Sequence, residues 1–591
     1  MSQASEKARE FLSKERAFRL GELMTESSHP KTRTLSEMIN DDVSAGIRML
    51  QSVDRDIPPV AQEVLASGTF TDLAKAFFET FAGGKRAFFT GCGATGRLSI
   101  LLEAAWREFW QRLKADYPAI ASQMPEMEDR CISVMAGGDF ALIKSVEGFE
   151  DFPDFGRRQI SEAGIEKDDL VVAITEGGET PFVIGTAWQG LDAGARVFFV
   201  YNNPSEMLCR HVQRSREVIE EPRIAKLDLA TGPMAITGST RMQATTIELL
   251  IVGAAMEIAL VRLLRKHLTP DELKTLGVIA RPGDYYYETF ERLLAEIESP
   301  ECVKAMSDLT QFEENIYREN GLITYAVDSL LLDVLTDTTE RSPTFMVPPF
   351  RRQGDTTSPL SWAFVKNPFS RTEQAWPGML RREPRGLTWA GDVYEQLNAP
   401  SALQANPPKL DNSEILRFMI GNEPDPSRTQ APASALVLTG VSGEMEHLSR
   451  EATRRLGDAF GRTAAITLGP EVRQTGIAET FHFLVDLPHS PLRLWEHLAI
   501  KLILNTVSTA TMVRMGRVRG NAMIWLSPSN KKLVDRGSRL ISQVAECTYE
   551  LACETLHEAM EEVERRQSTG AETPSPVALA IDWICDGRTG H

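Results

Sequence analysis

The sequence has too few basic residues to present a nucleic-acid-binding surface. Its 591 residues include 64 lysines and arginines against 82 aspartates and glutamates, so the formal net charge is −18. Nucleic-acid binding depends on a concentrated basic surface that neutralises phosphates. The composition therefore argues against nucleic acid as the main partner, and any anionic ligand must be held by local groups.

Long apolar runs and clustered cysteines are also missing. No 18-residue stretch is apolar and uncharged, and residues 1–16 are charged where a secretory signal needs an apolar core. We therefore expect a cytoplasmic protein with no membrane segment. The seven cysteines are scattered and match no zinc spacing, so we interpret them as reduced, buried thiols and expect no metal or cofactor.

Strand-like and helix-like segments alternate strictly from residue 85 onward. The strand-like segments are 86–91, 131–137, 169–175 and 195–203, and the helix-like segments are 97–110, 140–160, 181–194 and 242–266. This alternation with short turns predicts a parallel sheet covered by helices on both faces. Ligands of such sheets bind at the carboxyl ends of the strands.

A degraded copy of the same plan follows from about residue 300 to 564. Its strand candidates are 321–329, 433–440, 463–469 and 481–488, followed by a long helix over 492–516, with proline-rich loops between them. We predict an α/β fold of two related lobes, each a parallel sheet flanked by helices. The expected boundaries are a helical N-terminal segment 1–60, a first lobe 61–290, a degenerate second lobe 291–540 and a C-terminal helical segment with its tail, 541–591.

Three turns rich in glycine or hydroxyl groups precede helices of the first lobe: GCGATGR, ITEGGETP and AITGSTRM. Helix N-termini of this kind favour anions, and Thr180 before Pro181 predicts an N-cap with a first-turn proline. Each turn also fits a mere helix cap, but three in one sheet favour a shared ligand site. The candidate ligand-binding residues in these turns are Gly93, Thr95, Gly96, Thr175, Gly177, Gly178, Glu179, Thr180, Ser239 and Thr240.

These turns carry a resemblance, together with AGGDFALIKSVEGFED and the downstream segment KLILNTVSTATMVRMGRVRGNAMIWLSPSNKKLVDR. They resemble the sugar isomerase (SIS) domain family, and more narrowly the N-acetylmuramic acid 6-phosphate etherases and the glucokinase regulatory protein. Etherases have one such domain per chain and pair as homodimers, whereas the regulatory protein has two in tandem. The resemblance covers most of 20–265 and about 490–540. It implies two SIS-type lobes, a sugar or sugar phosphate as ligand, and either a monomeric internal pseudo-dimer or a homodimer.

The resemblance also implies roles for single residues. The two carboxylates of the EGxED segment fall on Glu147 and Glu150, and in etherases the second is the base for β-elimination of lactate. From the residues alone, this pair also fits an exposed helix face. Lys501 matches a lysine that the second lobe sends into the first lobe's site, although a snorkelling helix lysine is the alternative. His497, one turn earlier, is expected to be structural.

Departures from the etherase pattern leave the activity open. Ala105 stands where etherases carry a general-acid glutamate, and Glu103 is rotated from that position by roughly 200° on a helix. The run TDTTERSPTF of the second lobe resembles the same etherase run and places Glu340 at the acid position. One hypothesis is a composite site with Glu150 as base and Glu340 as acid; the alternative is that the second lobe has degenerated.

The second turn departs as well, because Gly177 replaces an etherase serine and Glu179 an etherase arginine. A carboxylate about 5 Å from a phosphate charge costs about 3 kcal/mol at an effective dielectric of about 20. Glu179 therefore either points away from the pocket or binds sugar hydroxyls. The sequence supports two functions: a phosphosugar-sensing protein that acts on a regulated partner, or an enzyme, either a lyase on N-acetylmuramic acid 6-phosphate or a related sugar, or a sugar-phosphate isomerase.

Overall fold

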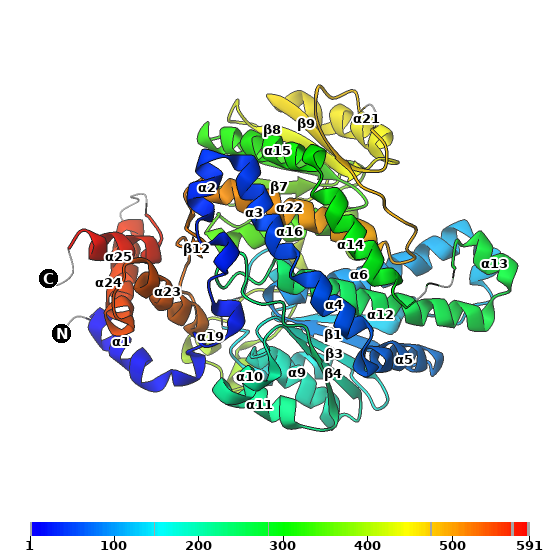
Figure 1. The fold of residues 1–591 in the computed structure, drawn as a ribbon, viewed down its shortest axis with the longest axis horizontal. Helices are drawn as coiled ribbons and strands as arrows, with labels where there is room; N and C mark the ends of the chain where they lie inside the picture. The colour runs from blue at the N-terminus through cyan, green and yellow to red at the C-terminus, as the bar shows by residue number, and fades with distance from the viewer. Residues whose placement is uncertain are drawn as a thin grey trace.

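Two five-stranded parallel sheets organise the described part of the chain. The computed structural model describes residues 3–146, 148–279, 281, 283–472, 475–568 and 573–587. The strand order is β2-β1-β3-β4-β5 in the first lobe and β10-β9-β8-β6-β7 in the second. Read from its other edge, the second order is β7-β6-β8-β9-β10, which is the same topology. The two lobes lie one below the other in Figure 1, and the predicted internal repeat is confirmed.

The strands of the first lobe are apolar on both faces because helices cover both sides of the sheet. All six residues of β3 are buried, for example. The strands are β1 (Ala87–Gly91), β2 (Cys131–Met135), β3 (Leu170–Thr175), β4 (Arg196–Tyr201) and β5 (Ile224–Asp228). The helices are α5 (Gly68–Ala82), α6 (Gly93–Asp116), α7 (Pro118–Ala121), α8 (Pro153–Glu162), α9 (Pro181–Asp192), α10 (Ser205–His211), α11 (Gln213–Glu220) and α12 (Gln243–His267).

The second lobe keeps the topology but carries longer insertions between its strands. Its strands are β6 (Ile323–Val327), β7 (Ala363–Lys366), β8 (Ala435–Val441), β9 (Arg462–Gly469) and β10 (Glu479–Leu484), with a small antiparallel pair, β11 (Val518–Arg519) and β12 (Ala522–Met523). The helices from the lobe junction onward are α13 (Pro270–Thr275), α14 (Tyr285–Ile297), α15 (Pro300–Arg318), α16 (Leu331–Phe345), α17 (Thr372–Leu380), α18 (Gly391–Gln396), α19 (Ser401–Ala405), α20 (Asn412–Ile415), α21 (Met445–Leu456) and α22 (Leu494–Arg514).

Two pairs of equivalent helices join the lobes. The long helices α12 and α22 contact each other, and each is buried nearly all round, as expected for a helix at the centre of a large protein. They approach closely at Gly253, where a Cβ atom would lie 2.7 Å from Leu494 Cδ1. The first crossover helices α6 and α16 also touch across the junction. Each lobe therefore places its first crossover helix against the other lobe.

The N-terminal and C-terminal helices fold together at one end of the molecule. Helix α1 (Gln3–Lys14) packs on α24 (Tyr549–Ser568), which also contacts α23 (Lys531–Val544) and α25 (Pro576–Cys585); we call these four helices the C-terminal module (Figure 1). The remaining N-terminal helices α2 (Leu35–Asp41), α3 (Val43–Asp54) and α4 (Ile57–Leu65) pack on the two lobes. Among the described residues, every helix is too short or too polar to span a membrane.

The structure corrects the predicted helix over 140–160. Residues Asp139–Leu142 form a 3-10 turn, and α8 starts only at Pro153. Gly148 between them has φ +77°, a left-handed conformation that glycine adopts without strain, and a proline at the first helical position favours a new start. Glu150 therefore lies on a turn and not on a helix face, and Glu147 lies outside the described residues. Strands β5 and β7 were not predicted.

Candidate functional site

The first glycine turn opens α6 at the end of β1. Gly93 has φ +57°, and a Cβ atom there would meet nothing within 4 Å. The Thr95 hydroxyl accepts a hydrogen bond from the Cys92 N–H (3.1 Å) and donates to the Cys92 carbonyl (2.9 Å). A Cβ at Gly96 would lie 2.6 Å from Met135 Cγ. Thr95 thus caps its own helix and Gly96 allows close packing, while Gly93 leaves open space beside the turn.

The second turn joins β3 to α9, and hydrogen bonds from neighbouring segments fix its backbone. Thr180 is the N-cap residue before Pro181, as predicted, but its hydroxyl bonds Thr175 Oγ1 at 3.1 Å and not the helix backbone. The carbonyls of Gly177 and Gly178 accept hydrogen bonds from Asn203 Nδ2 (2.9 Å) and Ser215 Oγ (2.7 Å). Gly178 has φ +70°, which only glycine adopts readily. The loop is therefore rigidly placed at the carboxyl end of the sheet.

Glu179 is neutralised by two cations. Its carboxylate is 1% exposed and lies 2.6 Å from Lys532 Nζ and 2.6 Å from Arg214 Nη2. Burial opposes its ionisation, but Lys532 and Arg214 outweigh burial and hold the pKa of Glu179 below its usual range. The repulsion expected between Glu179 and a phosphate is therefore offset by these partners.

Glu150 faces the N-terminus of α23 in the C-terminal module. Glu150 Oε1 accepts a hydrogen bond from Asn530 Nδ2 at 2.7 Å, and Oε2 lies 3.5 Å from Cys92 Sγ of the glycine turn. Lys532 belongs to the same segment as Asn530 and reaches Glu179. Residues 530–532 therefore cover the carboxyl edge of the first sheet, together with its three turns; we call this region the first-lobe edge.

The third turn precedes α12 and meets a carboxyl group that the sequence analysis overlooked. Thr240 hydrogen-bonds to Glu176, and burial raises the pKa of Glu176 to about 7. The Ser239 N–H donates to the Ile236 carbonyl at 2.9 Å, and Ser239 is buried. A carboxyl group with a pKa near 7 can exchange protons at neutral pH. In the sequence, Glu176 is recognisable as a glutamate in a glycine-rich turn that contains no basic residue and directly follows a buried strand.

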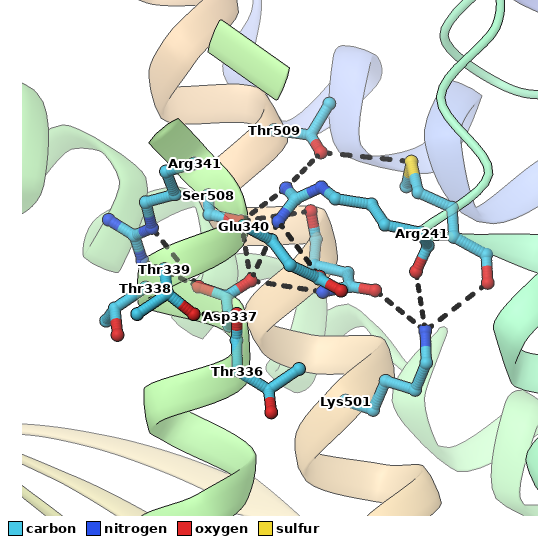
Figure 2. A network of polar contacts seen from close by, with 12 residues as sticks. Arg241, Thr336, Asp337, Thr338, Thr339, Glu340, Arg341, Lys501, Ser508 and Thr509 are labelled. Atoms are coloured by element: carbon cyan, nitrogen blue, oxygen red, sulfur yellow. Dashed lines mark hydrogen bonds and ion pairs between the residues drawn. The ribbon is translucent and has the colours of Figure 1, made fainter. Parts of the chain in front are cut away.

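A buried network of polar groups from both lobes lies behind this turn (Figure 2). Arg241 Nη1 lies 3.2 Å from Asp337 of α16, and Arg241 Nη2 donates to Ser508 Oγ of α22 at 2.7 Å. Lys501 Nζ donates to the Arg241 carbonyl (2.7 Å) and to Asn505 Oδ1 (2.9 Å). Glu340 Oε2 is 3.9 Å from Arg241 Nη1. We call these groups the inter-lobe network.

A small cavity connects the inter-lobe network to α6. Arg97, Glu340 and Lys501 are among the residues that line its volume of about 40 Å³. Burial raises the pKa of Glu340 and lowers that of Lys501 to about 8. A site for one water needs roughly 10 to 15 Å³, so this space admits a few waters and not a sugar ring. Among the described residues, no group of histidines, cysteines or carboxylates is arranged to hold a metal ion.

The predicted residues of the three turns and Glu150 lie at the carboxyl edge of the first sheet, but several of them face protein partners, and Glu147 lies outside the described residues. Glu150, Glu179 and Thr240 are engaged by Asn530, Lys532 and Glu176. Lys501 and Glu340 of the second lobe line the small cavity beside the first glycine turn, and Glu150 is not among the residues of that cavity. The roles of Asn530 and Lys532 were missed, although both lie in the SPSNKKLVDR segment that carries the resemblance. Asp337 was missed because its partner is distant in sequence.

One family model and several known proteins are similar to this chain. Residues 71–190 match the family model for the glucokinase regulatory protein N-terminal SIS domain. The N-acetylmuramic acid 6-phosphate etherase of Pectobacterium atrosepticum is 28% identical over 249 residues, which cover 41% of this chain and 71% of that protein. The etherase of Bacillus subtilis is 29% identical over 245 residues, covering 41% and 70%.

Similarity to solved structures is weaker. The crystal structure of tagatose-6-phosphate ketose/aldose isomerase from Escherichia coli has a TM-score of 0.42 and 12% identity, covering 81% of this chain and 94% of that chain. The match to the SIS domain model and the two etherases confirms the predicted resemblance to SIS-domain proteins.

Proposed function

Because the chain resembles SIS-domain proteins, we propose that the first-lobe edge binds a sugar phosphate and that the C-terminal module responds to it. The observation that carries this proposal is the pair of contacts from residues 530–532. Asn530 bonds Glu150, and Lys532 bonds Glu179, so the start of α23 closes the edge. A ligand at Glu150 has to replace the first contact. Ligand binding would therefore loosen α23, which links the sugar site to the module.

The charge at this edge favours an anionic sugar. Burial raises the pKa values of Asp151 and Glu176 to about 7, so these two carboxyl groups are partly protonated near neutral pH, and burial also raises the pKa of Glu340. Lys501, with a pKa of about 8, keeps its charge there. Positive charge held in a buried site with partly neutralised acids is suited to a phosphate group. The amino-sugar phosphates that etherases act on are the first candidates.

The proposal is tested by calorimetric titration with hexose 6-phosphates and N-acetylmuramic acid 6-phosphate, each beside its unphosphorylated sugar. Lys501→Met is expected to weaken binding of the phosphates by about 2 kcal/mol or more, which is about thirtyfold or more. Lys75→Met is the matched control, because Lys75 lies on the exposed face of α5 with 62% of its side chain accessible. Equal affinity for the phosphorylated and unphosphorylated sugars would contradict the proposal.

The sensing step has its own measurement. Hydrogen exchange of α23 amides should become faster when a sugar phosphate is bound, because Asn530 has lost its partner Glu150. Unchanged exchange in α23 at ligand saturation would show that ligand binding does not affect the C-terminal module, and would contradict the sensing step.

A lyase is the second candidate, and Glu340 favours it. Burial raises the pKa of Glu340, which suits a group that must donate a proton to a leaving group, and Glu340 lines the first lobe's cavity from the second lobe. Glu150 would act as base. The test is release of lactate from N-acetylmuramic acid 6-phosphate, with exchange of the sugar C2 proton in deuterated buffer. Binding without either reaction would reject the lyase, and exchange abolished by Glu150→Gln would support it.

A further inference from the structure

The carboxyl edge of the second sheet opens onto a cavity of its own. The cavity has a volume of about 160 Å³ and is lined by Asp328 and Ser329, which follow β6, and by Asn367, which follows β7. Because both sheets have the same topology, this place in the second lobe is equivalent to the first-lobe edge. Helix α6 covers it with Ala104 and Ala105. We call this region the second-lobe edge.

His497 indicates that the second-lobe edge takes a ligand. The residue is 5% exposed, and its Nδ1 lies 2.9 Å from Asp333 Oδ1. Its Nε2 is buried and has no hydrogen-bond partner among the described residues, and His497 lines the cavity. Buried polar atoms are almost always paired, so the partner of Nε2 is expected in the cavity. This observation is independent of the acidic residues around it.

The charges around the cavity select a neutral ligand. Glu108, Asp328 and Asp333 are carboxylates of the lining, and Arg381 is already paired with Glu108 at 3.2 Å. Glu108 is also held by Arg493 at 3.1 Å. A phosphate would meet the carboxylates of Asp328 and Asp333 without a free arginine or lysine in the lining to balance it. The second-lobe edge thus differs in charge from the first-lobe edge.

The hydrogen-bonding chemistry favours hydroxyl groups. Asp333 can only accept from the Nδ1–H of His497, which leaves Nε2 as an acceptor in the neutral imidazole and as a donor in the imidazolium. A hydroxyl group is both donor and acceptor and therefore matches Nε2 in either state. Asp328 adds a carboxylate acceptor at the mouth, where its Oδ1 receives one hydrogen bond, from Asn367 Nδ2 at 3.1 Å.

The volume limits the ligand to one ring. An apolar cavity of about 150 Å³ accommodates benzene, so about 160 Å³ suits a single six-membered ring. We propose that the second-lobe edge binds a neutral, polyhydroxylated six-membered ring, such as an unphosphorylated pyranose, with His497 and Asp328 as hydrogen-bonding groups. The chain would then bind two sugars of different charge at equivalent places in its two lobes.

Imidazole NMR of the full chain labelled with 15N-histidine tests this proposal directly. The sequence has nine histidines, and the signal missing in His497→Gln assigns His497. D-glucose and N-acetyl-D-glucosamine are the probes, and D-glucose 6-phosphate is the charged comparison. We expect a saturable shift of the His497 Nε2 signal with at least one neutral sugar, and at least about tenfold weaker binding of the phosphate at this site.

Two variants separate the two edges. Ala105→Leu fills the second cavity without removing a polar contact, and it should abolish the His497 response while sugar phosphates still bind the first-lobe edge. Lys501→Met should do the opposite, so that failure of one site leaves the other measurable. No saturable shift with either neutral sugar, or an unchanged shift in Ala105→Leu, would overturn the proposal. An equal response to glucose 6-phosphate would overturn its assignment to a neutral ligand.

Discussion

The first-lobe edge and the second-lobe edge occupy equivalent positions in their lobes, but their side chains differ. The first-lobe edge has a glycine turn and the paired cations of Glu179, and beside its glycine turn lies a cavity of about 40 Å³ lined by Arg97, Glu340 and Lys501. At the second-lobe edge, Asp328 and Ser329 replace the glycine turn, and the cavity is about 160 Å³. The other lobe's first crossover helix lines each cavity, α16 the first and α6 the second. The shared topology therefore determines where a site lies, whereas the loops and the covering helix determine its chemistry.

The two first crossover helices place Ala105 and Glu340, the two residues that match the etherase acid position, at different cavities. Ala105 on α6 lines the second cavity, and Glu340 on α16 lines the first. The position that resembles the etherase acid in the first lobe therefore faces the second lobe's edge. In the composite-site hypothesis, the acid for the first-lobe edge is Glu340 on α16, which lines the first cavity.

The prediction with the largest expected effect tests whether the inter-lobe network holds the two lobes together. Arg241→Met would leave the buried carboxylate of Asp337 without one of its cations. Breaking a buried ion pair costs about 3 to 5 kcal/mol, so the first unfolding transition in urea should lose about that much free energy. Arg223→Ala is the control, because Arg223 pairs with Glu221 on the surface and its removal should leave the transition unchanged. A loss below about 1 kcal/mol would mean that the inter-lobe network contributes little to holding the lobes together.

The sequence predicted the repeat but not the contents of the second edge. Periodicity and turn residues identified the buried strands β1, β3 and β4, because each is a continuous apolar run. Strand β7 has only four residues between proline-rich loops, and β5 contains Lys226 and Asp228, so neither gave a clear signal. The helix predicted over 140–160 was wrong because apolar spacing outweighed Gly148 and Pro153.

The candidate site was predicted through the resemblance, and its partners were not. Glu150, Lys501 and Glu340 were named because matching segments drew attention to them. Asn530 lies 380 positions from Glu150, and Asp337 lies 96 from Arg241. Pairings over such distances depend on tertiary packing, which periodicity does not report. The lone histidine His497 was expected to be structural; the ligand-binding role proposed above rests on its Nε2, which lies beside a cavity and has no hydrogen-bond partner in the described part of the chain.

The second prediction separates the closing contact of the first-lobe edge from the helix cap. Asn530 caps α23 by accepting from the Leu533 N–H at 2.9 Å and also donates to Glu150. Asn530→Asp keeps the cap but cannot donate, and it faces Glu150 with a second carboxylate. We expect the closed state to lose about 1 to 3 kcal/mol. The α23 amides should then exchange faster without ligand, whereas the histidine spectrum at the second-lobe edge should not change. Unaltered exchange would show that the contact does not hold the module closed.

The third prediction uses pH to distinguish the edges. Burial lowers the pKa of Lys501 to about 8, so the free protein loses this charge as the pH rises through that value. A bound phosphate favours the charged lysine, so its affinity should fall by up to about tenfold per pH unit above pH 8. The Lys501→Met variant should lack this decrease, and neutral-sugar binding at the second-lobe edge should not show it. A pH-independent phosphate affinity between pH 8 and 9.5 would remove Lys501 from the site.

The smallest expected effect concerns the glycine turn that only the first-lobe edge retains. Gly93 has φ +57° with open space for a Cβ, so Gly93→Ala costs only the left-handed conformation, about 1 to 2 kcal/mol. Gly378 in α17 lines the second cavity, also has open space, and is not among the positive-φ glycines. Gly378→Ala should therefore stabilise by about 0.4 to 1 kcal/mol, because alanine is the better helix former. Opposite signs in urea unfolding would show that the left-handed turn at the first-lobe edge depends on glycine at position 93. Equal signs would show that the turn does not depend on glycine at position 93, and the difference between the edges would then rest on side chains alone.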